Sequence, residues 1–269
     1  MVEIRVSKIV LFPIKSLDGI SVNAAAVLPS GALEHDREFA LYDDADRWIN
    51  GKSEARLNNI RATYDLANLA VTLTSPASPE ARTFDLVGNL AVLEEWFSDT
   101  LAKAVHIKRD THSGFPDDSH AQGPTVISSG TIAEMSSWYA LSDLDETRRR
   151  FRANVEVSAD TAFWEDRLFG KRGDDVGFSL GDVHLYGVGP CKRCVVPVRD
   201  SITGQPTPDF EKRFIAKRLE TLPDWSTRAR FGPLYYRVAV NTRLDMSEGG
   251  KHVNVGDQLR LDDKVGVNP

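Results

Sequence analysis

The chain is built mainly from short segments rich in β-branched and aromatic residues, and this pattern limits its fold more than any other feature. In the first part of the chain such segments cover residues 4–11, 37–42, 69–74 and 104–108. Within 69–74, apolar residues alternate with polar ones until a Ser-Pro pair ends the run. A two-residue period that stops at proline is typical of half-buried strands. The N-terminal part is therefore predicted to consist of short β-strands.

One helical period interrupts these strands. Apolar residues recur at intervals of three or four at Leu90, Leu93, Phe97 and Leu101. That spacing puts them on one face of a helix, and Asn89 precedes them as a candidate N-cap. The sequence predicts a helix over this stretch, followed by a return to strand.

A polar segment separates the two halves of the chain. Residues 111–124 (THSGFPDDSHAQGP) are rich in Gly, Pro, Ser and Asp, which is typical of a linker or a mobile loop. We therefore expect two parts, residues 1–118 and residues 119–269.

Beyond this segment, further short strands alternate with helices. Strands are predicted over residues 125–128, 154–157, 182–188, 235–240 and 253–261. A short helix is expected to start near Ser129, and a basic helix is expected to place Phe210, Phe214 and Leu219 on one side. Many short strands with only three or four helices favour barrel-like sheets over a doubly wound fold. The predicted fold class is α+β, mostly β.

Charge and hydropathy argue against several classes of function. Lys and Arg total 33 while Asp and Glu total 39, and the net charge of −6 does not favour bulk nucleic-acid binding. Residues 9–12 form a short apolar run, far below the ~20 residues of a membrane span. The N-terminus carries charges where a signal peptide has its apolar region, and two cysteines are too few for a disulfide scaffold. We expect a cytoplasmic protein with reduced thiols and with no nucleic-acid or membrane partner.

Both cysteines lie in one motif, residues 189–194 (GPCKRC), directly after a predicted strand. Lys192 and Arg193 favour the thiolate form, because nearby cations stabilise the charged sulfur. A thioredoxin-like pair is disfavoured because the following Val-Val-Pro-Val does not open a helix, and a structural zinc site lacks a second pair of ligands. Two interpretations remain open: one soft thiolate that binds a soft metal or metal cofactor, or two small buried residues.

Four more segments offer groups that suit an anion. Lys15 and Ser16 end the first strand, Arg37 follows a His-Asp pair, Lys52 lies in a Gly-Lys-Ser sequence, and four arginines gather within 148–152. Each has an ordinary alternative as a surface cation or a solvated helix end. None completes a P-loop, a hydrolase nucleophile elbow or a dinucleotide fingerprint. Together with the thiols, they predict an anion-binding pocket that contains one reactive thiol.

In their order and spacing, these segments resemble the MOSC proteins, which are named after the C-terminal domain of molybdenum cofactor sulfurase. Residues 9–16, 35–37 and 52–57 resemble the N-terminal β-barrel domain of that family. The segments that resemble the MOSC domain itself are residues 151–154, 190–194, 203–204, 231–232 and 255–257. The resemblance is greatest to bacterial relatives of the mitochondrial amidoxime-reducing component. It implies a MOSC-type β-barrel preceded by a β-rich N-terminal barrel domain, with a few short helices.

The resemblance implies a bound molybdenum cofactor, a pyranopterin with a dithiolene and a terminal phosphate. Cys194 stands at the position of the family's molybdenum ligand, so it is the implied metal-binding and catalytic residue, and a thiolate flanked by cations suits that metal. The implied cofactor-binding residues are Lys15, Ser16, Arg37, Lys52, Ser128, Arg152, Asn154, Arg193 and Cys194. Asp200 stands at the position of a family aspartate, and the family also implies pyridoxal phosphate binding. Bonds from arginine to phosphate explain why an acidic chain gathers these cations.

The implied activity is that of a molybdenum-dependent oxidoreductase that reduces small N-oxygenated substrates such as hydroxylamines or amidoximes. Its electrons would come from an external donor, a flavin reductase alone or with a small electron carrier, because the chain has neither an intact nicotinamide fingerprint nor a four-cysteine cluster motif. Pro197 and Val198 stand where amidoxime-reducing members have two threonines, which bears on the substrate. Two alternatives stay open: a carrier of the cofactor, or of sulfur on Cys194, and a cofactor-free redox or structural protein that uses Cys191 and Cys194.

Overall fold

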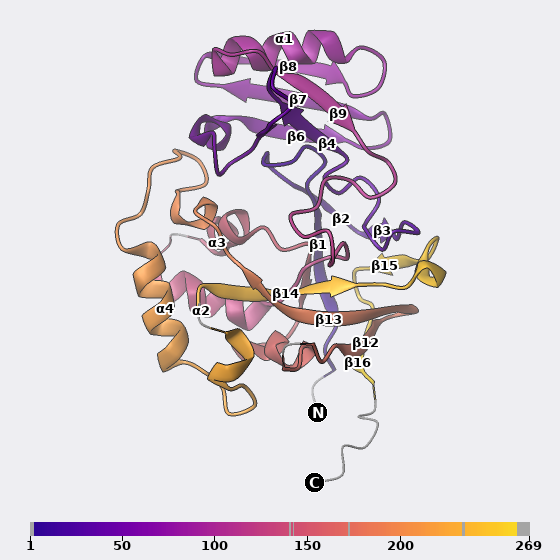
Figure 1. The fold of residues 1–269 in the computed structure, drawn as a ribbon, viewed down its shortest axis with the longest axis vertical. Coiled ribbons are helices and arrows are strands. Elements are labelled where there is room, and N and C mark those ends of the chain that lie inside the picture. The colour runs from indigo at the N-terminus through magenta and orange to yellow at the C-terminus, as the bar shows by residue number, and fades with distance from the viewer. Residues whose placement is uncertain (1–2, 140, 142, 172, 233–234, 263–269) are drawn as a thin grey trace.

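Short strands dominate the computed structural model, which describes residues 3–139, 141, 143–171, 173–232 and 235–262. The described strands outnumber the helices, so the predicted fold class, α+β and mostly β, is confirmed. Figure 1 shows two bodies stacked one above the other, the smaller one in indigo and magenta at the top.

The larger body is built on an eight-stranded sheet. Its spatial order is β16 (Leu259–Leu261), β12 (Val176–Leu180), β13 (Val183–Lys192), β14 (Arg237–Arg243), β10 (Val126–Ser128), β11 (Val155–Val157), β1 (Val6–Leu11) and β2 (Ile20–Val22). Neighbouring strands are antiparallel except for β10 and β11, which run parallel. The strands predicted near residues 4–11, 125–128, 154–157, 182–188 and 235–240 are all present in this sheet.

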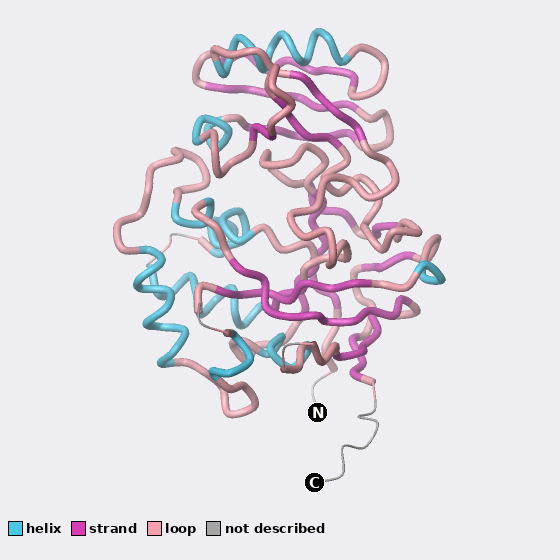
Figure 2. The backbone as a smooth tube through the Cα atoms, viewed as in Figure 1, coloured by secondary structure: helices cyan, strands magenta, loops and turns pink. Residues whose placement is uncertain are grey.

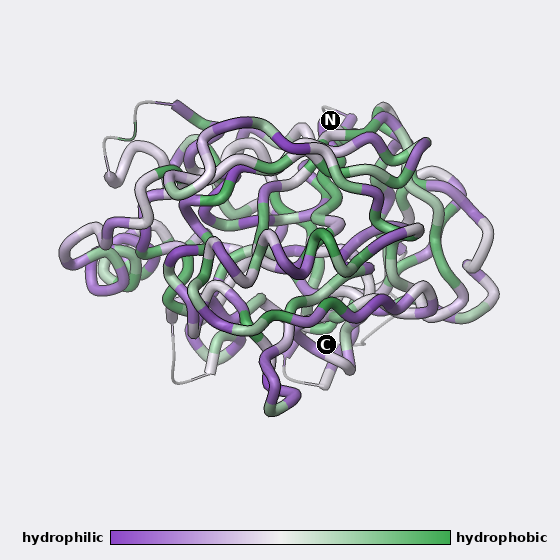
Figure 3. Tube along the Cα trace, turned by 90° about the horizontal axis from the view of Figure 1, so that it is seen from above, coloured by the Kyte–Doolittle hydropathy of each residue, from purple (hydrophilic) through white to green (hydrophobic). Residues whose placement is uncertain are grey.

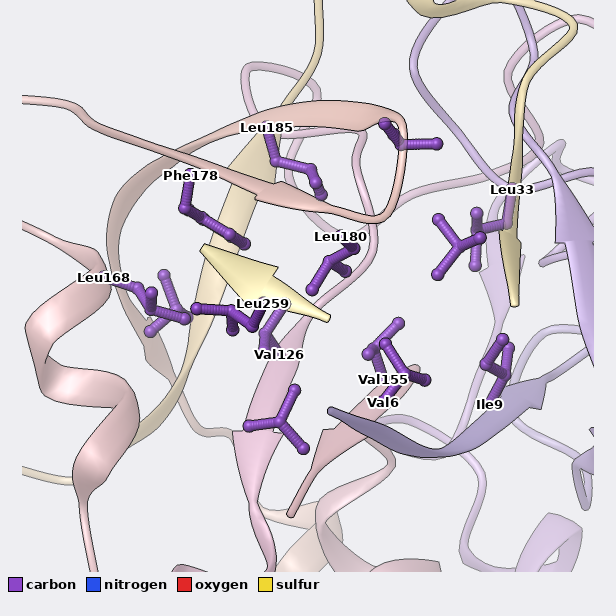
Figure 4. Packing of buried hydrophobic residues seen from close by; sticks show 14 of the residues in the cluster. Val6, Ile9, Leu33, Val126, Val155, Leu168, Phe178, Leu180, Leu185 and Leu259 are labelled. Atoms are coloured by element: carbon purple, nitrogen blue, oxygen red, sulfur yellow. The ribbon is translucent and has the colours of Figure 1, made fainter. Parts of the chain in front are cut away.

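The sheet curls into a barrel-like layer because its two ends approach each other. Arg5, just before β1, bridges Gln258, just before β16, and the Val6 amide donates to the Asp257 carbonyl at 2.8 Å. Beside this junction, β3 (Ala24–Ala26) pairs with β15 (His252–Asn254). Aliphatic and phenylalanine side chains fill the interior, as Figure 4 shows. Burial of each such side chain stabilises the fold by about 1.5–3 kcal/mol.

The smaller body contains two three-stranded sheets and one covering helix. The sheets are β5 (Trp48–Ile49), β4 (Phe39–Tyr42) and β9 (His106–Arg109), and β6 (Arg61–Asp65), β7 (Ala70–Ser75) and β8 (Ser78–Asp85). The predicted helix is α1 (Leu90–Leu101), which buries Leu93, Phe97 and Leu101 against these sheets. Asn89 is the N-cap residue, but its side chain makes no capping hydrogen bond.

Three further helices pack together at one side of the large sheet (Figures 1 and 2). They are α2 (Ser129–Tyr139), α3 (Leu144–Phe151) and α4 (Phe210–Glu220). Phe210 and Phe214 are buried as expected, while Leu219 is only half-buried. Helix α3 was not predicted, because its mostly charged residues show no helical spacing of apolar side chains. Its N-cap is Asp143, whose side chain accepts a hydrogen bond from the Glu146 amide.

Five short 3-10 turns complete the described elements. They are η1 (Ala55–Asn59), η2 (Trp164–Leu168), η3 (Val196–Val198), η4 (Arg228–Phe231) and η5 (Met246–Glu248). Of these, η1 and η3 adjoin the site described below. Figure 3 shows that apolar stretches along the trace are short and separated by polar ones. Within the described ranges, no helix has both the length and the hydropathy to cross a bilayer.

The two packed cores do not follow the expected division at residues 118 and 119. Strands β1 and β2 lie in the large sheet beside β11, and β3 pairs with β15 near the C-terminal end. The first strands of the chain therefore belong to the core of the second part, and the chain enters the smaller body only afterwards. The physical reason is that β1 buries both its hydrogen-bonding edges only between β11 and β2.

Candidate functional site

A cleft of about 710 Å³ lies where loops from the two bodies meet. The smaller body contributes the turn after β1 and the segments around residues 50–61. The larger body contributes the end of α3 and the segment 191–202, which begins at the end of β13. Residues of the 111–124 segment form a further part of the wall. Segments far apart in the sequence thus meet in one place, large enough for a cofactor-sized ligand.

Most of the predicted site residues line this cleft. Those that do are Lys15, Ser16, Arg37, Lys52, Arg152, Asn154, Arg193 and Cys194. Cys191 lines it as well. The placement agrees with the prediction of one anion-binding pocket that contains a thiol.

Ser128 is the exception, and it lies outside the cleft. Its side chain is fully buried, and its hydroxyl hydrogen-bonds Glu165 Oε2 at 2.7 Å and Thr131 Oγ1 at 2.9 Å. Strand β10 places this residue in the interior, where its hydrogen bond offsets part of the free energy that burial of the Glu165 carboxyl group costs. The structure therefore corrects the expectation that Ser128 belongs to the pocket wall.

The lining of the cleft is strongly basic. Ten Lys or Arg side chains and four aspartates line it, in a chain whose overall net charge is −6. The basic residues are Lys15, Arg37, Lys52, Arg61, Arg149, Arg150, Arg152, Lys192, Arg193 and Arg199. Such a concentration of one sign in a concave site attracts anions.

Three of the predicted residues hold an unusual backbone conformation. Ser16, Arg37 and Arg152 have φ angles of 75°, 54° and 51°. Non-glycine residues adopt this left-handed region rarely, and it costs about 1–2 kcal/mol per residue. At Arg152 the conformation ends α3 and lets its amide donate to the Arg148 carbonyl. It also turns the side chain of Arg152 into the cleft, as the lining shows.

Arg152 is the clearest anion-binding candidate of the group. Its guanidinium lies over the Phe12 ring at 4.1 Å, and no carboxylate of the described residues pairs with it. Burial and the nearby Arg37 lower the pKa of Arg152 to about 10. Burial disfavours the charged form of this guanidinium, and no carboxylate forms an ion pair with it within the described residues. The binding of an anion would therefore stabilise it more than it would stabilise a cation that is already paired.

Arg37 is held by its neighbour. Its guanidinium donates to Asp36, whose other carboxylate oxygen accepts from the Phe12 amide at 2.9 Å. Burial acts to lower the pKa of Arg37, but Asp36 and Asp117 raise it above the ordinary value. The His-Asp-Arg sequence therefore positions a cation rather than a hydrolase base.

Lys15 and Lys52 share one counter-ion. Lys15 Nζ lies 3.1 Å from Asp117 Oδ1, and Lys52 Nζ lies 3.5 Å from the same atom. Lys15 also donates to the Phe115 carbonyl at 2.7 Å. Burial, opposed by Asp117 and reinforced by Arg37 and Lys52, lowers the pKa of Lys15 to about 8.

The GPCKRC motif lies at an irregular end of β13. The pairing register with β14 shifts between Pro190 and Lys192, so Cys191 stands at a bulge. Cys191 and Cys194 are free and half-buried, and Arg193 Nη1 donates to Cys191 Sγ at 3.2 Å. The segment continues into the 3-10 turn η3 instead of a helix, which confirms the argument against a thioredoxin-like motif.

A structural zinc site is not formed around these thiols. Within the described parts of the chain, no three His, Cys, Asp or Glu side chains gather as metal ligands. The motif instead presents its sulfurs to a basic cleft, next to a buried Arg193 Nε that has no hydrogen-bond partner.

Two of the predicted residues have their polar atoms engaged within the protein. Asn154 accepts from the Thr125 amide at 3.2 Å and donates to the Val10 carbonyl at 3.2 Å, so it joins β1 to the strand beside it. Ser16 Oγ accepts from the Gly51 amide at 3.0 Å. Both shape the wall, and Ser16 retains its hydroxyl proton for a ligand.

Asp200 does not line the cleft. Its carboxylate closes the turn that follows η3 by accepting from the Thr203 amide at 2.8 Å, and it lies 3.4 Å from Arg150 Nη2. Asp200 therefore shapes the segment that carries the cleft wall.

Sequence reasoning missed several lining residues because nothing local marks them. Arg199 donates to the Gly51 carbonyl and so ties the segment after the cysteines to the smaller body. Asp117 lies in a segment that looks like a linker, yet it pairs with two lysines of the cleft. Only the spatial approach of distant segments identifies these residues.

Comparisons with known proteins agree with this architecture. The MOSC N-terminal beta barrel domain matches residues 3–104, and the MOSC domain matches residues 125–260. A molybdenum cofactor sulfurase of Oryza sativa subsp. japonica is 23% identical over 308 residues, covering 98% of this chain and 35% of that protein. A molybdenum cofactor sulfurase of Drosophila erecta is 24% identical over 282 residues, covering 94% of this chain and 34% of that protein. The chain thus spans about a third of the length of these relatives. With a domain match over each part of the chain and a barrel-like sheet beneath a basic, thiol-bearing cleft, this chain belongs to the MOSC family.

Proposed function

We propose that this chain binds a molybdenum cofactor in the cleft and uses it to reduce small N-oxygenated compounds. The observation that carries the proposal is one cleft that combines the Cys194 thiol with cations that include the unpaired Arg152. The names of the relatives, both molybdenum cofactor sulfurases, support a role related to that cofactor.

The residues of the cleft fit the chemical groups of such a cofactor. Cys194 offers one soft sulfur ligand for the metal. Arg152 and Arg193 suit the anionic and polar edges of a pterin, since Arg193 Nε is buried without a partner. Lys15, Lys52 and Arg37 suit a phosphate, because charge-assisted bonds to phosphate are strong.

The proposed reaction converts an N-hydroxyl group to the amine. Two electrons and two protons enter for each N–O bond that breaks, and the oxygen leaves as water. The bound molybdenum would supply the two-electron oxygen-transfer chemistry. The chain's own residues would bind and orient the cofactor, and Cys194 would contribute a thiolate ligand to the metal.

The segment that follows Cys194 adds apolar side chains to the otherwise basic lining. Val196, Pro197 and Ile202 line the cleft, while Val198 packs against the cluster formed by α2, α3 and α4. Of the two positions that depart from the amidoxime-reducing pattern, only Pro197 therefore faces the ligand. We propose that at position 197 the substrate contacts the protein by apolar packing and not through a hydroxyl group.

An external donor would supply the electrons. We propose a flavin reductase, alone or with a small electron carrier, in a cytoplasmic setting. The basic cleft lining favours encounter with an acidic partner, so the rate of electron transfer should fall as salt is added. Pyridoxal phosphate binding stays a prediction.

A second candidate function is a carrier of the cofactor or of sulfur, without substrate turnover. The observation that favours it is the two free thiols at the cleft, together with the name of the relatives, molybdenum cofactor sulfurases. In that case Cys194 would hold a sulfur atom as a persulfide.

Metal analysis and a reductase assay distinguish the two functions. The full-length protein, purified with its cofactor, is analysed for molybdenum and then assayed with a hydroxylamine and a chemical reductant. About one molybdenum per chain with turnover supports the reductase. A Cys194 persulfide without turnover supports the carrier, and protein with neither metal nor persulfide after expression in a cofactor-producing host contradicts both.

A further inference from the structure

Asp117 pairs with two of the cations that line the cleft. It lies in the 111–124 segment, and one of its oxygens contacts both Lys15 and Lys52, at 3.1 and 3.5 Å. Lys15, Arg37 and Lys52 outweigh the effect of burial and hold the pKa of Asp117 well below its usual range. The carboxylate is therefore ionised and neutralises cations that we assigned to a phosphate.

The two partners of this contact differ in exposure. The Lys15 side chain is 6% exposed, whereas the Asp117 side chain is 57% exposed. Lys15 is also held in place by the Phe115 carbonyl and by the Trp48 ring, 4.3 Å from its Nζ. Lys15 is thus fixed in position, whereas the carboxylate of Asp117 can leave the contact and be hydrated by solvent.

The segment that carries Asp117 is anchored on both sides of it. The Phe115 amide donates to the Arg37 carbonyl at 2.8 Å, and the Gly123 amide donates to the Thr242 carbonyl at 2.9 Å. Between these anchors, residues 117–120 are exposed. The tip can therefore move outward while both ends remain attached, since exposed backbone with few contacts opens at low free-energy cost.

We propose that Asp117 is a built-in competitor for the anion site, and that a phosphate-bearing ligand binds by displacing it and releasing the tip of the 111–124 segment. The inference rests on the anion-binding role proposed above for Lys15 and Lys52. Displacement exchanges one carboxylate for a ligand that carries more charge, and the freed carboxylate regains its hydration. Ligand entry and movement of this segment are thereby coupled.

The first test is the affinity for inorganic phosphate, measured by titration calorimetry on the full chain without cofactor at pH 7 and about 0.15 M ionic strength. Asp117→Asn keeps a hydrogen-bond acceptor for Lys15 but removes the competing charge. We expect it to bind phosphate about two- to fivefold more tightly, the range that a partly exposed ion pair contributes. A thermal unfolding scan of each variant confirms that it is folded.

Asp118→Asn is the matched control. It removes the same charge from the neighbouring position, where Asp118 accepts from Asn241 Nδ2 at 3.4 Å and pairs with no lysine of the described chain. Its phosphate affinity should stay close to that of the unmodified protein. Equal gains in both variants would show an effect of net charge alone, and weaker binding by Asp117→Asn would show that Asp117 positions the lysines; either result overturns the proposal.

The second test is hydrogen exchange of peptides that cover residues 116–122. Saturating phosphate should speed their exchange in the unmodified protein and should have a smaller effect in Asp117→Asn, where no ion pair with the lysines holds the tip. Slower or unchanged exchange on phosphate binding would overturn the coupling. Both tests use phosphate without molybdenum, so their results can be interpreted even if the metal assay contradicts the reductase proposal.

Discussion

Cys194 and Cys191 differ in the roles that the cleft assigns to them, although they stand three positions apart. Cys191 lies at the bulge of β13 and accepts a hydrogen bond from Arg193, whereas Cys194 lies beyond the strand. We predict that Cys194→Ser lowers molybdenum content or activity severely while Cys191→Ser has a mild effect. Molybdenum analysis and a reductase assay of both variants check this. Equal loss in the two variants would indicate a redox pair instead of a single ligand.

Arg152 has the role that is easiest to isolate, because no carboxylate of the described residues lies within ion-pair distance of it, although Asp18 and Asp36 are near enough to favour its charge. A charged hydrogen bond contributes about 1.5–3 kcal/mol, so Arg152→Ala should lower cofactor retention about tenfold or more. Retention is measured as cofactor remaining after dialysis. The control is Arg47→Ala, whose side chain is 78% exposed and pairs with Asp43 on the surface. Similar retention in both variants would contradict the assignment of Arg152.

Lys15 should make anion binding depend on pH. Burial lowers its pKa to about 8, so the ammonium loses its proton as the pH rises through that value. Arg37 and Asp117, which face it, keep their charges in that range, because the pKa of Arg37 is raised and that of Asp117 is held well below its usual range. Sulfate, whose own charge is constant, should therefore bind more weakly above about pH 8 than at pH 6.5.

The Lys15→Gln variant serves as the comparison for that profile. It should bind sulfate more weakly at pH 6.5 and should show a flatter profile, because the neutral amide of glutamine has no proton to lose as the pH rises. An unchanged profile in Lys15→Gln would assign the pH dependence to another group.

At the scale of the elements, α4 is attached to the rest of the larger body through a buried ion pair. Arg218 is fully buried, lies over the Phe163 ring at 3.7 Å and donates to Asp166 of η2. The sequence predicted the apolar face of α4 but gave no sign that an arginine would lie in the core beside it. Its burial depends on η2, which is distant along the chain.

Removing one partner of this pair should destabilise the protein strongly. Arg218→Met leaves Asp166 as an unpaired buried carboxyl group, which costs about 3–5 kcal/mol in free energy of unfolding. Urea denaturation measures the change. The double variant Arg218→Met, Asp166→Leu should recover most of the loss, and a double variant as unstable as the single one would show that packing of Arg218 matters more than its charge.

At the scale of the whole molecule, the first strands complete the larger body. Val6, Ile9 and Leu11 of β1 are buried in its core, and β1 lies between β11 and β2. We predict that residues 119–269 expressed alone do not fold cooperatively. Loss of these three side chains alone removes about 5–9 kcal/mol, a large part of the ~5–15 kcal/mol stability of a typical domain.

Circular dichroism and urea denaturation of that fragment check this prediction. Adding residues 1–33 as a separate chain should restore part of the cooperative transition. A cooperative transition in the fragment alone would mean that the division at residues 118 and 119 separates independent folding units.

The sequence alone determined about half of the described strands, the helix at 90–101 and the set of residues that resembles the MOSC pattern, whereas the one strand expected over 253–261 is two strands, β15 and β16, in different sheets. Local periods and turn residues carry that information, because a strand or an amphipathic helix needs only its own spacing of apolar side chains. Helix α3 was not predicted, because the one strong local signal for it is the N-cap Asp143, and the residues that follow are mostly charged.

Only the tertiary structure decided which of the candidate residues meet. Ser128 follows the same strand pattern as its neighbours, yet β10 turns it inward to Glu165. Asp117 lies in a segment of linker-like composition, yet it reaches Lys15 about a hundred positions away. Whether a polar side chain faces a cleft or the core depends on contacts between distant segments, and no local spacing encodes those contacts. The physical reason is that burial and charge pairing depend on which segments pack together, within one body for Ser128 and between segments about a hundred positions apart for Asp117.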